Sequence, residues 1–521
     1  MVYKKTPQEI WGEYEKAVSY KHSINLYEQV EQNENFFIGK QWEGVNAPDL
    51  PKPVINILKR VVSYFIAMIV SDDIGIQLTP YRQFDGAINA DLQAEVLSNE
   101  VDKAIEYADI KAKARKVVRN AAVDGDGALY FYWDEDAKPN GHIKCELIDN
   151  TNILPANPHS DDIQEQKYII IEQQKTLDEV RDEAKENGIS QSEIDTIAED
   201  KNSNIYDVSE NAGNELVTVL IKLWRENGVV KAIKVTRNVV IKKEWNTGYS
   251  LYPLAVMAWE RVKNSCHGQA AITGLIPNQI SINQLFAMAI HSVKSNAFPK
   301  IIYDASRIPT WSNKVGQAIQ VHGDPNTAIA SNFRGADMSN QVMELIDSII
   351  QKTLEFMGAS DAALGNVKPV NTSAIIATQK AAAMPLELQR LEYYRFTESY
   401  IRILLDMMRS HYGVRYVEAE INGELYKADY DFSTETAETF NLQVDIGSSA
   451  YWNELMQIQT QDNLFEKGII TDAITYLEGI PDQYIKGKAK MIADLKNKQE
   501  AMQMQAPMQA QPVQPIQPPM L

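Results

Sequence analysis

The sequence Ile276-Pro-Asn-Gln-Ile-Ser-Ile-Asn-Gln-Leu-Phe-Ala-Met-Ala-Ile-His-Ser-Val-Lys-Ser-Asn-Ala297 carries an unbroken helical pattern. Its apolar side chains recur near the spacing of an α-helix. A segment rich in glycine, proline and asparagine follows at 298–336, and a second apolar helical pattern runs from Asp337 to Met357. We therefore predict two helices separated by a compact mixed segment.

The chain beyond this helix pair continues with a loop and a long helix. Residues 358–371 are mostly small or polar and contain Gly365 and Pro369, which favours a loop. Residues 372–412 carry helical spacing, and Pro385 is expected to bend that helix because it removes a backbone donor. We predict three strands, over 414–420, 424–429 and 442–446. A helical set is predicted over 449–500, and residues 501–521, rich in Gln, Pro and Met, are predicted to form a disordered tail.

The N-terminal half alternates between helical and strand patterns. We predict helices over 8–38, 54–70 and 85–123. We predict strands over 74–80, 128–133, 141–148, 217–225, 229–236, 239–245 and 251–259, the last of which is expected to close the sheet formed by the three before it. Residues 172–215 are acidic and poor in large apolar side chains, so they predict a solvent-facing insertion. The fold class is α+β, mainly helical.

Composition restricts the classes of protein further. The 521 residues include 51 Lys and Arg against 70 Asp and Glu, a net charge of −19. Such a chain is not expected to hold nucleic acid by bulk attraction. Two cysteines, Cys145 and Cys266, are too few for a disulfide framework. The longest apolar run, from Val61 to Val70, is about half of what a bilayer needs. We expect a soluble intracellular protein with no membrane contact.

The sequence offers only weak candidates for catalytic residues. Asp124, Asp126 and Asp134 suggest a metal-dependent nuclease, but a strand pattern separates Asp134 from the other two, and an Asp-Gly turn is the preferred interpretation. Cys266 and His267 are adjacent, and neighbouring side chains seldom form a nucleophile pair. The sequence has no phosphate-binding glycine motif and no zinc-ligand spacing. We predict no catalytic residues, no metal site and no cofactor, and hence no enzyme.

Basic residues form two sparse groups. The first, on one predicted helix, consists of Lys111, Lys113, Arg115, Lys116 and Arg119. We interpret it as a solvated face or a protein–protein salt-bridge surface in preference to a DNA contact. The second, at the end of the first central helix and in the segment after it, consists of Lys294, Lys300, Arg307 and Lys314. Aromatic residues do not interleave with either group as they do in single-strand binders.

Four short motifs, in this order, give the chain a family resemblance. They are Phe36-Phe-Ile-Gly-Lys-Gln-Trp-Glu-Gly44, Pro53-Val-Ile-Asn-Ile-Leu-Lys-Arg-Val61, Asp124-Gly-Asp-Gly-Ala-Leu-Tyr-Phe-Tyr-Trp-Asp134 and Pro277-Asn-Gln-Ile-Ser-Ile-Asn283. Together with the order of the predicted elements, they resemble the portal (head-to-tail connector) proteins of tailed bacteriophages. Another ring component of the virion neck or tail is the structural alternative, although such adaptors are usually much shorter.

The resemblance implies an architecture of wing, stem, clip and crown in a ring of about twelve subunits around an axial channel. The implied parts are wing 1–275, stem helices 276–297 and 337–357, clip 298–336, tunnel loop 358–371, long wing helix and strands 372–448, crown 449–500 and tail 501–521. Both stem helices have apolar residues on more than one side, as expected of helices that also contact a neighbouring subunit.

The resemblance also implies a function, partners and sites. The ring would admit double-stranded DNA during packaging and release it during ejection, at one vertex of a capsid assembled in the bacterial cytoplasm. Its partners would be the major capsid and scaffolding proteins, the terminase large subunit and a head–tail adaptor. The implied site residues are Gly365, Asn366, Val367, Lys368, Pro369, Val370 and Asn371 in the tunnel loop, Lys294 and Lys300 in the channel, and Arg307, Trp311 and Lys314 for docking.

Overall fold

The computed structural model describes residues 6–70, 74–80, 90–137, 141–199, 216–297, 300–312, 314, 318–327, 330–333, 340–357, 384–421, 424–434, 440–446 and parts of 458–495. The chain divides into two compact units. One comprises residues 1–70 and 75–445, and the other comprises residues 71–74 and 446–521. The fold is mixed α and β with more helix than strand.

The N-terminal helices are shorter than the sequence pattern predicts. The expected helix 8–38 is two helices, α1 (Pro7–Ser23) and α2 (Leu26–Ile38), separated where Asn25 adopts a left-handed φ of 54°. The expected helix 85–123 is likewise divided, into α4 (Ala90–Tyr107) and α5 (Ile110–Asp124), at Asp109 with φ 51°. Asn and Asp tolerate this conformation better than other residues with side chains. Both predictions of one continuous helix were therefore wrong, whereas α3 (Ile57–Val70) confirms the helix predicted over 54–70.

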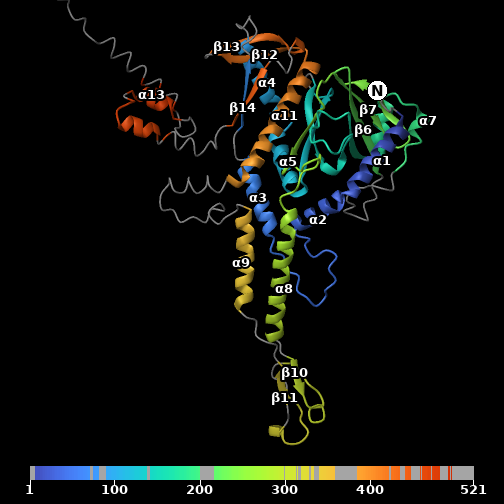
Figure 1. The fold of residues 1–521 in the computed structure, drawn as a ribbon, viewed down its shortest axis with the longest axis vertical. Coiled ribbons are helices and arrows are strands. Elements are labelled where there is room, and N and C mark those ends of the chain that lie inside the picture. Colours follow the sequence, from blue (N-terminus) through green and yellow to red (C-terminus); the bar gives the residue numbers. More distant parts are fainter. Residues whose placement is uncertain are drawn as a thin grey trace, which may run out of the picture. The chain divides into compact units, whose positions relative to one another are not determined.

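We call the packed part of the chain before α8 (Ile276–Ala297), together with the later helix α11 (Glu387–His411), the body. An antiparallel five-stranded sheet forms one half of the body (Figure 1). Its strands, in spatial order, are β4 (Ile153–Pro155), β5 (Tyr168–Thr176), β6 (Leu216–Glu226), β7 (Val229–Val235) and β8 (Val240–Asn246). Helix α1 packs on one face through Ile10, Tyr14 and Val18. Helix α6 (Leu177–Glu186) and the short helix α7 (Gln191–Ile194) cover the other face. Successive side chains of β6 point to opposite faces of the sheet, so this strand contributes to both cores.

The described part of the acidic segment 172–215 is not a simple solvent-facing insertion. Residues up to Thr176 belong to β5, and Leu177, Val180 and Ala184 of α6 are buried against the sheet. Acidic residues occupy the outer side of α6, so the composition concealed a narrow apolar face. Residues 200–215 lie outside the described part of the chain.

A three-stranded sheet forms the centre of the body. Its order is β3 (His142–Asp149), β2 (Asp126–Asp134) and β9 (Leu254–Ala258), so β9 joins β2 instead of closing the five-stranded sheet, and that prediction was wrong. Helix α5 approaches β2 very closely at Gly127, where a Cβ atom would lie 2.4 Å from the carbonyl oxygen of Val117. Helix α11 (Glu387–His411) packs against β9.

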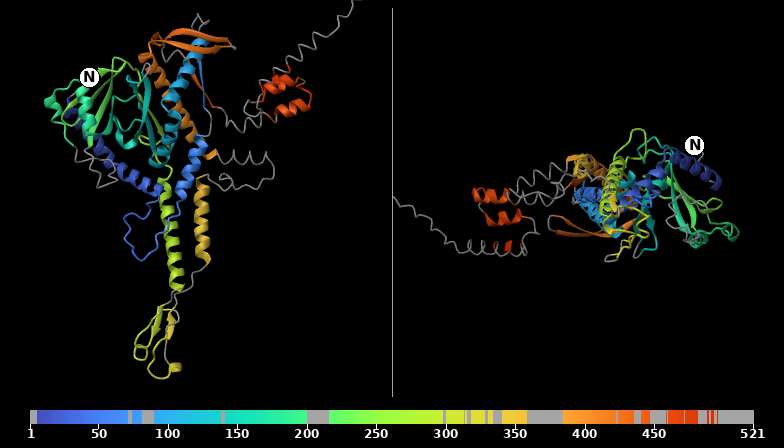
Figure 2. Two further views of the ribbon diagram at one scale, coloured as in Figure 1. Left: turned by 180° about the vertical axis from the view of Figure 1, so that it is seen from behind. Right: turned by 90° about the horizontal axis from the view of Figure 1, so that it is seen from below.

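Two helices run side by side away from this body (Figures 1 and 2). Helix α8 spans Ile276–Ala297, as predicted, and α9 spans Asn340–Phe356, within the predicted range. Between them in sequence, β10 (Lys300–Tyr303) pairs with β11 (Ala330–Phe333) in antiparallel register, and both strands lie beyond the far ends of the helices (Figure 1).

The strands after α11 confirm the sequence pattern. Strand β12 (Val414–Ile421) pairs with β13 (Glu424–Asp431), and β14 (Phe440–Ile446) pairs with β1 (Ile74–Pro80). Helix α11 begins at Glu387, directly after a 3₁₀ turn over Met384–Leu386 that contains Pro385. Residues 372–383, where the predicted helix would begin, lie outside the described residues.

Beyond β14, the described part of the second unit contains helices. Residues 460–466 form one helical stretch, and α13 (Ala473–Glu478) follows with Asp472 as its N-cap. The rings of Phe465 and Tyr476 join the two, with centroids 4.6 Å apart. The predicted tail 501–521 lies outside the described residues.

Candidate functional site

The α8–α9 pair is the feature that the central sequence pattern singled out. The helices pack through Ile346 of α9, which is fully buried, and through a hydrogen bond of 3.2 Å from Asn278 Nδ2 to Thr353 Oγ1. Asn278 lies in the first turn of α8 and Thr353 in the last turn of α9. The two helices are therefore antiparallel and joined at the end nearest the body.

A cluster of buried carboxamides attaches the base of α8 to residues 41–57. Gln279 Nε2 donates to the carbonyl of Ile55 at 2.7 Å, and the N–H of Ile57 donates back to Gln279 Oε1 at 3.1 Å. Asn283, one turn further along α8, donates to Gln41 Oε1 at 2.6 Å. Gln279, Asn283 and Gln41 are all buried. We call these three residues the amide anchor.

The amide anchor contains no ionisable group, and its hydrogen bonds are mutually supporting. Gln279 Nε2 also donates to Asn283 Oδ1 at 3.1 Å, and Gln41 Nε2 donates to the carbonyl of Phe36 at 2.9 Å. Buried polar groups are tolerated when they are satisfied in this way. The attachment of α8 to the body is thus expected to depend little on pH or salt.

The exposed surface of the α8–α9 pair carries both large apolar and charged side chains. Large apolar side chains remain exposed on both helices, with exposed fractions of 59% for Met288, 59% for Val293, 50% for Leu345 and 84% for Phe356. Helix α9 also exposes three acidic side chains, those of Glu344, Asp347 and Glu355, and Glu355 forms an ion pair with the exposed Lys352 at 3.0 Å. Exposed apolar residues grouped on a helix pair indicate a contact surface.

The predicted site residues near α8 are spread over its end and the following segment. Lys294 is exposed in the last turn of α8, and Lys300 starts β10 opposite Phe333. Trp311 stacks on Tyr303 of β10 with ring centroids 5.5 Å apart. This stacking joins the segment after β10 to the strand itself.

The remaining two predicted residues of this group are exposed. Arg307 donates to the carbonyl of Thr327 at 2.7 Å, so it ties together two parts of the segment between α8 and α9. Lys314 is exposed. The tunnel-loop residues Gly365, Asn366, Val367, Lys368, Pro369, Val370 and Asn371 lie outside the described residues.

The three aspartates of the nuclease hypothesis do not form one site. Asp126 and Asp134 stand at opposite ends of β2, and Asp134 forms an ion pair with Lys144 at 2.5 Å. Asp126 is buried and accepts hydrogen bonds from the N–H of Gly268 at 2.7 Å and from the ring of His267 at 3.0 Å. Among the residues that the structure describes, no group of three potential metal ligands is found. This geometry is contrary to the nuclease hypothesis. Asp126 of the Asp-Gly motif instead binds His267 and Gly268, in the segment that precedes α8.

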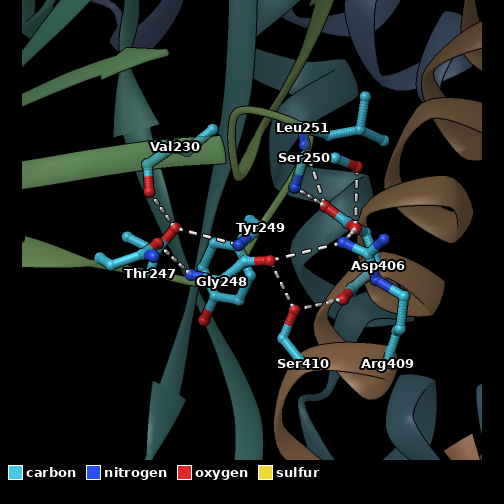
Figure 3. Close-up of polar contacts among 10 residues, drawn as sticks. Val230, Thr247, Gly248, Tyr249, Ser250, Leu251, Asp406, Arg409 and Ser410 are labelled. Atoms are coloured by element: carbon cyan, nitrogen blue, oxygen red, sulfur yellow. Dashed lines mark hydrogen bonds and ion pairs between the residues drawn. The ribbon is translucent and has the colours of Figure 1, made fainter. Parts of the chain in front are cut away.

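A charged residue that the sequence analysis did not select connects α11 with the body (Figure 3). Asp406 is buried on α11, and its carboxylate accepts the N–H groups of Ser250 at 2.6 Å and Leu251 at 2.9 Å. The hydroxyl of Ser250 and the guanidinium of Arg409 complete its shell, at 2.9 and 2.7 Å. In the sequence Asp406 follows Ile403, Leu404 and Leu405, but nothing local indicates its backbone partners.

The comparison with protein families assigns this arrangement. A family model described as phage P22-like portal protein matches residues 13–424, well over half of the chain. The chain belongs to this family. The match includes the body, α8, the segment after it, α9 and α11, so the portal resemblance of the sequence is confirmed.

The family places the chain among structural proteins of the phage and not among enzymes. The chain is accordingly a phage portal protein. No protein in a search of curated sequences matches it. Among the helices that the structure describes, none combines the length and the hydropathy that crossing a membrane requires.

Proposed function

We propose that about twelve copies of this chain form a ring around an axial channel that conducts double-stranded DNA into the capsid and out again. The observation that carries the proposal is the family match over residues 13–424, which includes a helix pair with a small sheet beyond its far ends. One such pair per subunit can form a wall only when neighbouring pairs stand beside it.

The parts of the chain take the following roles in this proposal. Helices α8 and α9 are the stem through the capsid wall, residues 298–336 are the clip, and residues 358–371 are the tunnel loop. Residues 1–275 and 372–448 form the wing, and residues 449–500 form the crown. Arg307, Trp311 and Lys314 contribute to the clip surface that docks the terminase and later the head–tail adaptor.

The exposed apolar residues of α8 and α9 support contact between neighbouring stems. Leu345 and Phe356 are large and apolar, and in the single chain they face solvent. Burying them against an adjacent subunit is favourable by about 25 cal/mol for each Å² removed from water. A ring requires a head-to-tail contact, in which the two contacting surfaces of a subunit differ.

The charge balance fits a channel for moving DNA. A ring of about twelve copies would carry on the order of −230 charges, by multiplication of the −19 of one chain. Acidic walls do not grip phosphates, whereas each Lys or Arg contact adds holding strength. Lys294, Lys300 and Lys368 would each supply one ring of positive charge, enough to guide the duplex without retaining it.

The partners and the location follow from the same proposal. The ring occupies one vertex of the capsid, contacts the major capsid and scaffolding proteins, and passes the genome from the terminase to the tail side. A DNA-packaging reaction tests it: heads assembled with this chain are expected to take up DNA when the phage's own terminase and ATP are added. Uptake of the same amount by heads assembled without the chain would refute the proposal.

A further inference from the structure

A small cavity lies beside the segment that leads into α8. It is lined by Asp126, Asn150, Ile153, Pro155, Ile163, Val256, Cys266 and His267. Its volume accessible to the centre of a water molecule is about 20 Å³. A cavity needs roughly 10–15 Å³ by this measure to hold one water. The space is therefore sufficient for one water molecule and insufficient for a larger ligand.

Two polar atoms of the lining lack a partner among the residues that the structure describes. They are Nε2 of His267 and Oδ1 of Asn150, in side chains that are 9% and 2% exposed. Leaving such atoms unsatisfied in the interior is unfavourable, because the unfolded chain hydrogen-bonds them to water. Both atoms belong to residues that line the same cavity.

The chemistry of these two atoms follows from their neighbours. Asn150 Nδ2 donates to the carbonyl of Asp124 at 2.9 Å, so the other amide atom, Oδ1, is an acceptor. The ring Nδ1 of His267 lies 3.0 Å from a carboxylate oxygen of Asp126, which can only accept while it is ionised. Nδ1 therefore carries a proton, and while the ring is neutral Nε2 has none and is an acceptor as well. Two acceptors cannot satisfy each other.

The buried ammonium of Lys21, which bonds the backbone of residues 150–153, is already committed. Lys21 donates to the carbonyls of Asn150, Thr151 and Ile153 at 2.7, 2.8 and 2.7 Å, which uses all three of its protons. The pair of acceptors thus requires a donor with two protons that fits a cavity of this size.

We propose that this cavity binds one structural water molecule, which donates one hydrogen bond to His267 Nε2 and the other to Asn150 Oδ1. The water adds to the contacts between Asp126 and residues 267–268, and we call these contacts together the joint. Because residue 268 lies eight positions before the start of α8 and Ala271 bonds the carbonyl of Ala122 at 2.9 Å, the joint fixes the chain that leads into α8. The inference concerns the subunit and does not rest on the proposed ring.

A map of the assembled protein at a resolution that shows ordered waters tests the proposal directly. We expect a density peak within hydrogen-bond distance of both His267 Nε2 and Asn150 Oδ1. A cavity without such a peak, or a cavity filled by a rotated side chain, would overturn the proposal.

The variant Val256→Ile gives an independent test through the sign of its effect. The added methyl group can displace the water but cannot replace its two hydrogen bonds, so we expect the Tm to fall by about 2–4 °C. In a dry cavity the same methyl group would fill empty space and raise the Tm. A rise would therefore contradict the water site even if the variant folds normally.

Discussion

The carboxamide of Asn283, on the second turn of α8, donates a hydrogen bond of 2.6 Å to Gln41 Oε1, which is 242 positions earlier in the chain. Through this contact and those of Gln279, the helix that leaves the body is attached to the segment between α2 and α3 without any charge. A substitution at this anchor should therefore lower the stability by an amount that does not depend on salt, unlike a substitution at a charged contact.

The first prediction concerns the amide anchor. Replacing Asn283 with Leu leaves Gln41 Oε1 and Gln279 Nε2 without one partner each, so we expect a loss of about 2–3 kcal/mol in the free energy of unfolding. Because no charge is involved, the loss should be the same at low and at high salt. Chemical denaturation followed by tryptophan fluorescence measures both quantities. Gln284→Leu, on the exposed side of the same helix, is the control. Equal losses in the two variants would show that the anchor contributes nothing specific.

A second prediction concerns Asp406. The variant Asp406→Ala leaves the buried N–H groups of Ser250 and Leu251 without their acceptor, and we expect a loss of about 3 kcal/mol. Hydrogen exchange of these two amides should become faster, whereas exchange within α8 should not change. Asp347→Ala, at an exposed position of α9, serves as the control. Unchanged exchange at residues 250 and 251 would mean that Asp406 does not hold this loop.

The third prediction is a dependence on pH. Burial raises the pKa of Asp124 to about 8 from its ordinary 3.8, although Arg119 opposes the shift. Between these two values the folded state holds a proton that the unfolded state has lost, so this group makes stability fall as pH rises towards 8. Asp124→Asn removes the titration. We expect its Tm at a pH of about 9 to exceed that of the wild type by roughly 4 °C and the two to converge near pH 4.

Thermal unfolding at several pH values checks this expectation. Asp136→Asn provides a matched control, because Asp136 is exposed in the turn after β2. Parallel pH profiles of the wild type and the Asp124 variant would contradict the assignment of this titration to Asp124.

A fourth prediction addresses the exposed apolar residues of α9. Leu345→Asp and Phe356→Asp should leave the subunit folded, because both side chains face solvent in the single chain, but should reduce ring formation at least about tenfold. Native mass spectrometry measures the species present, and circular dichroism checks the fold. Glu355→Gln, at an exposed acidic position of the same helix, should assemble normally. Full assembly of both aspartate variants would exclude these residues from the contact between neighbouring stems.

Local patterns predicted much of this fold. The apolar spacing over 276–297 gave the bounds of α8 because a helix that packs on more than one side repeats its apolar residues regularly. The breaks at Asn25 and Asp109 escaped prediction because a single left-handed residue leaves the apolar pattern almost unchanged. The placement of β9 beside β2 also escaped, since pairing between strands about 130 residues apart is decided by packing and not by local sequence.

The candidate site was predictable in part. The order of the helix pair and the intervening segment pointed to the family, but the sequence gives no measure of which polar residues become buried. Gln279 and Asn283 look like surface residues in a helix, and only the approach of residues 41–57 makes them an anchor. Asp406 was likewise hidden, because its partners are backbone groups of a distant loop.

The central claim is that this chain assembles into a ring with an open channel. Electron micrographs of the purified full-length protein, viewed along the particle axis, test it most directly. We predict rings of about twelve subunits with a central hole wide enough for a DNA duplex. Particles that remain monomeric under all assembly conditions, or rings whose centre is closed, would contradict the account.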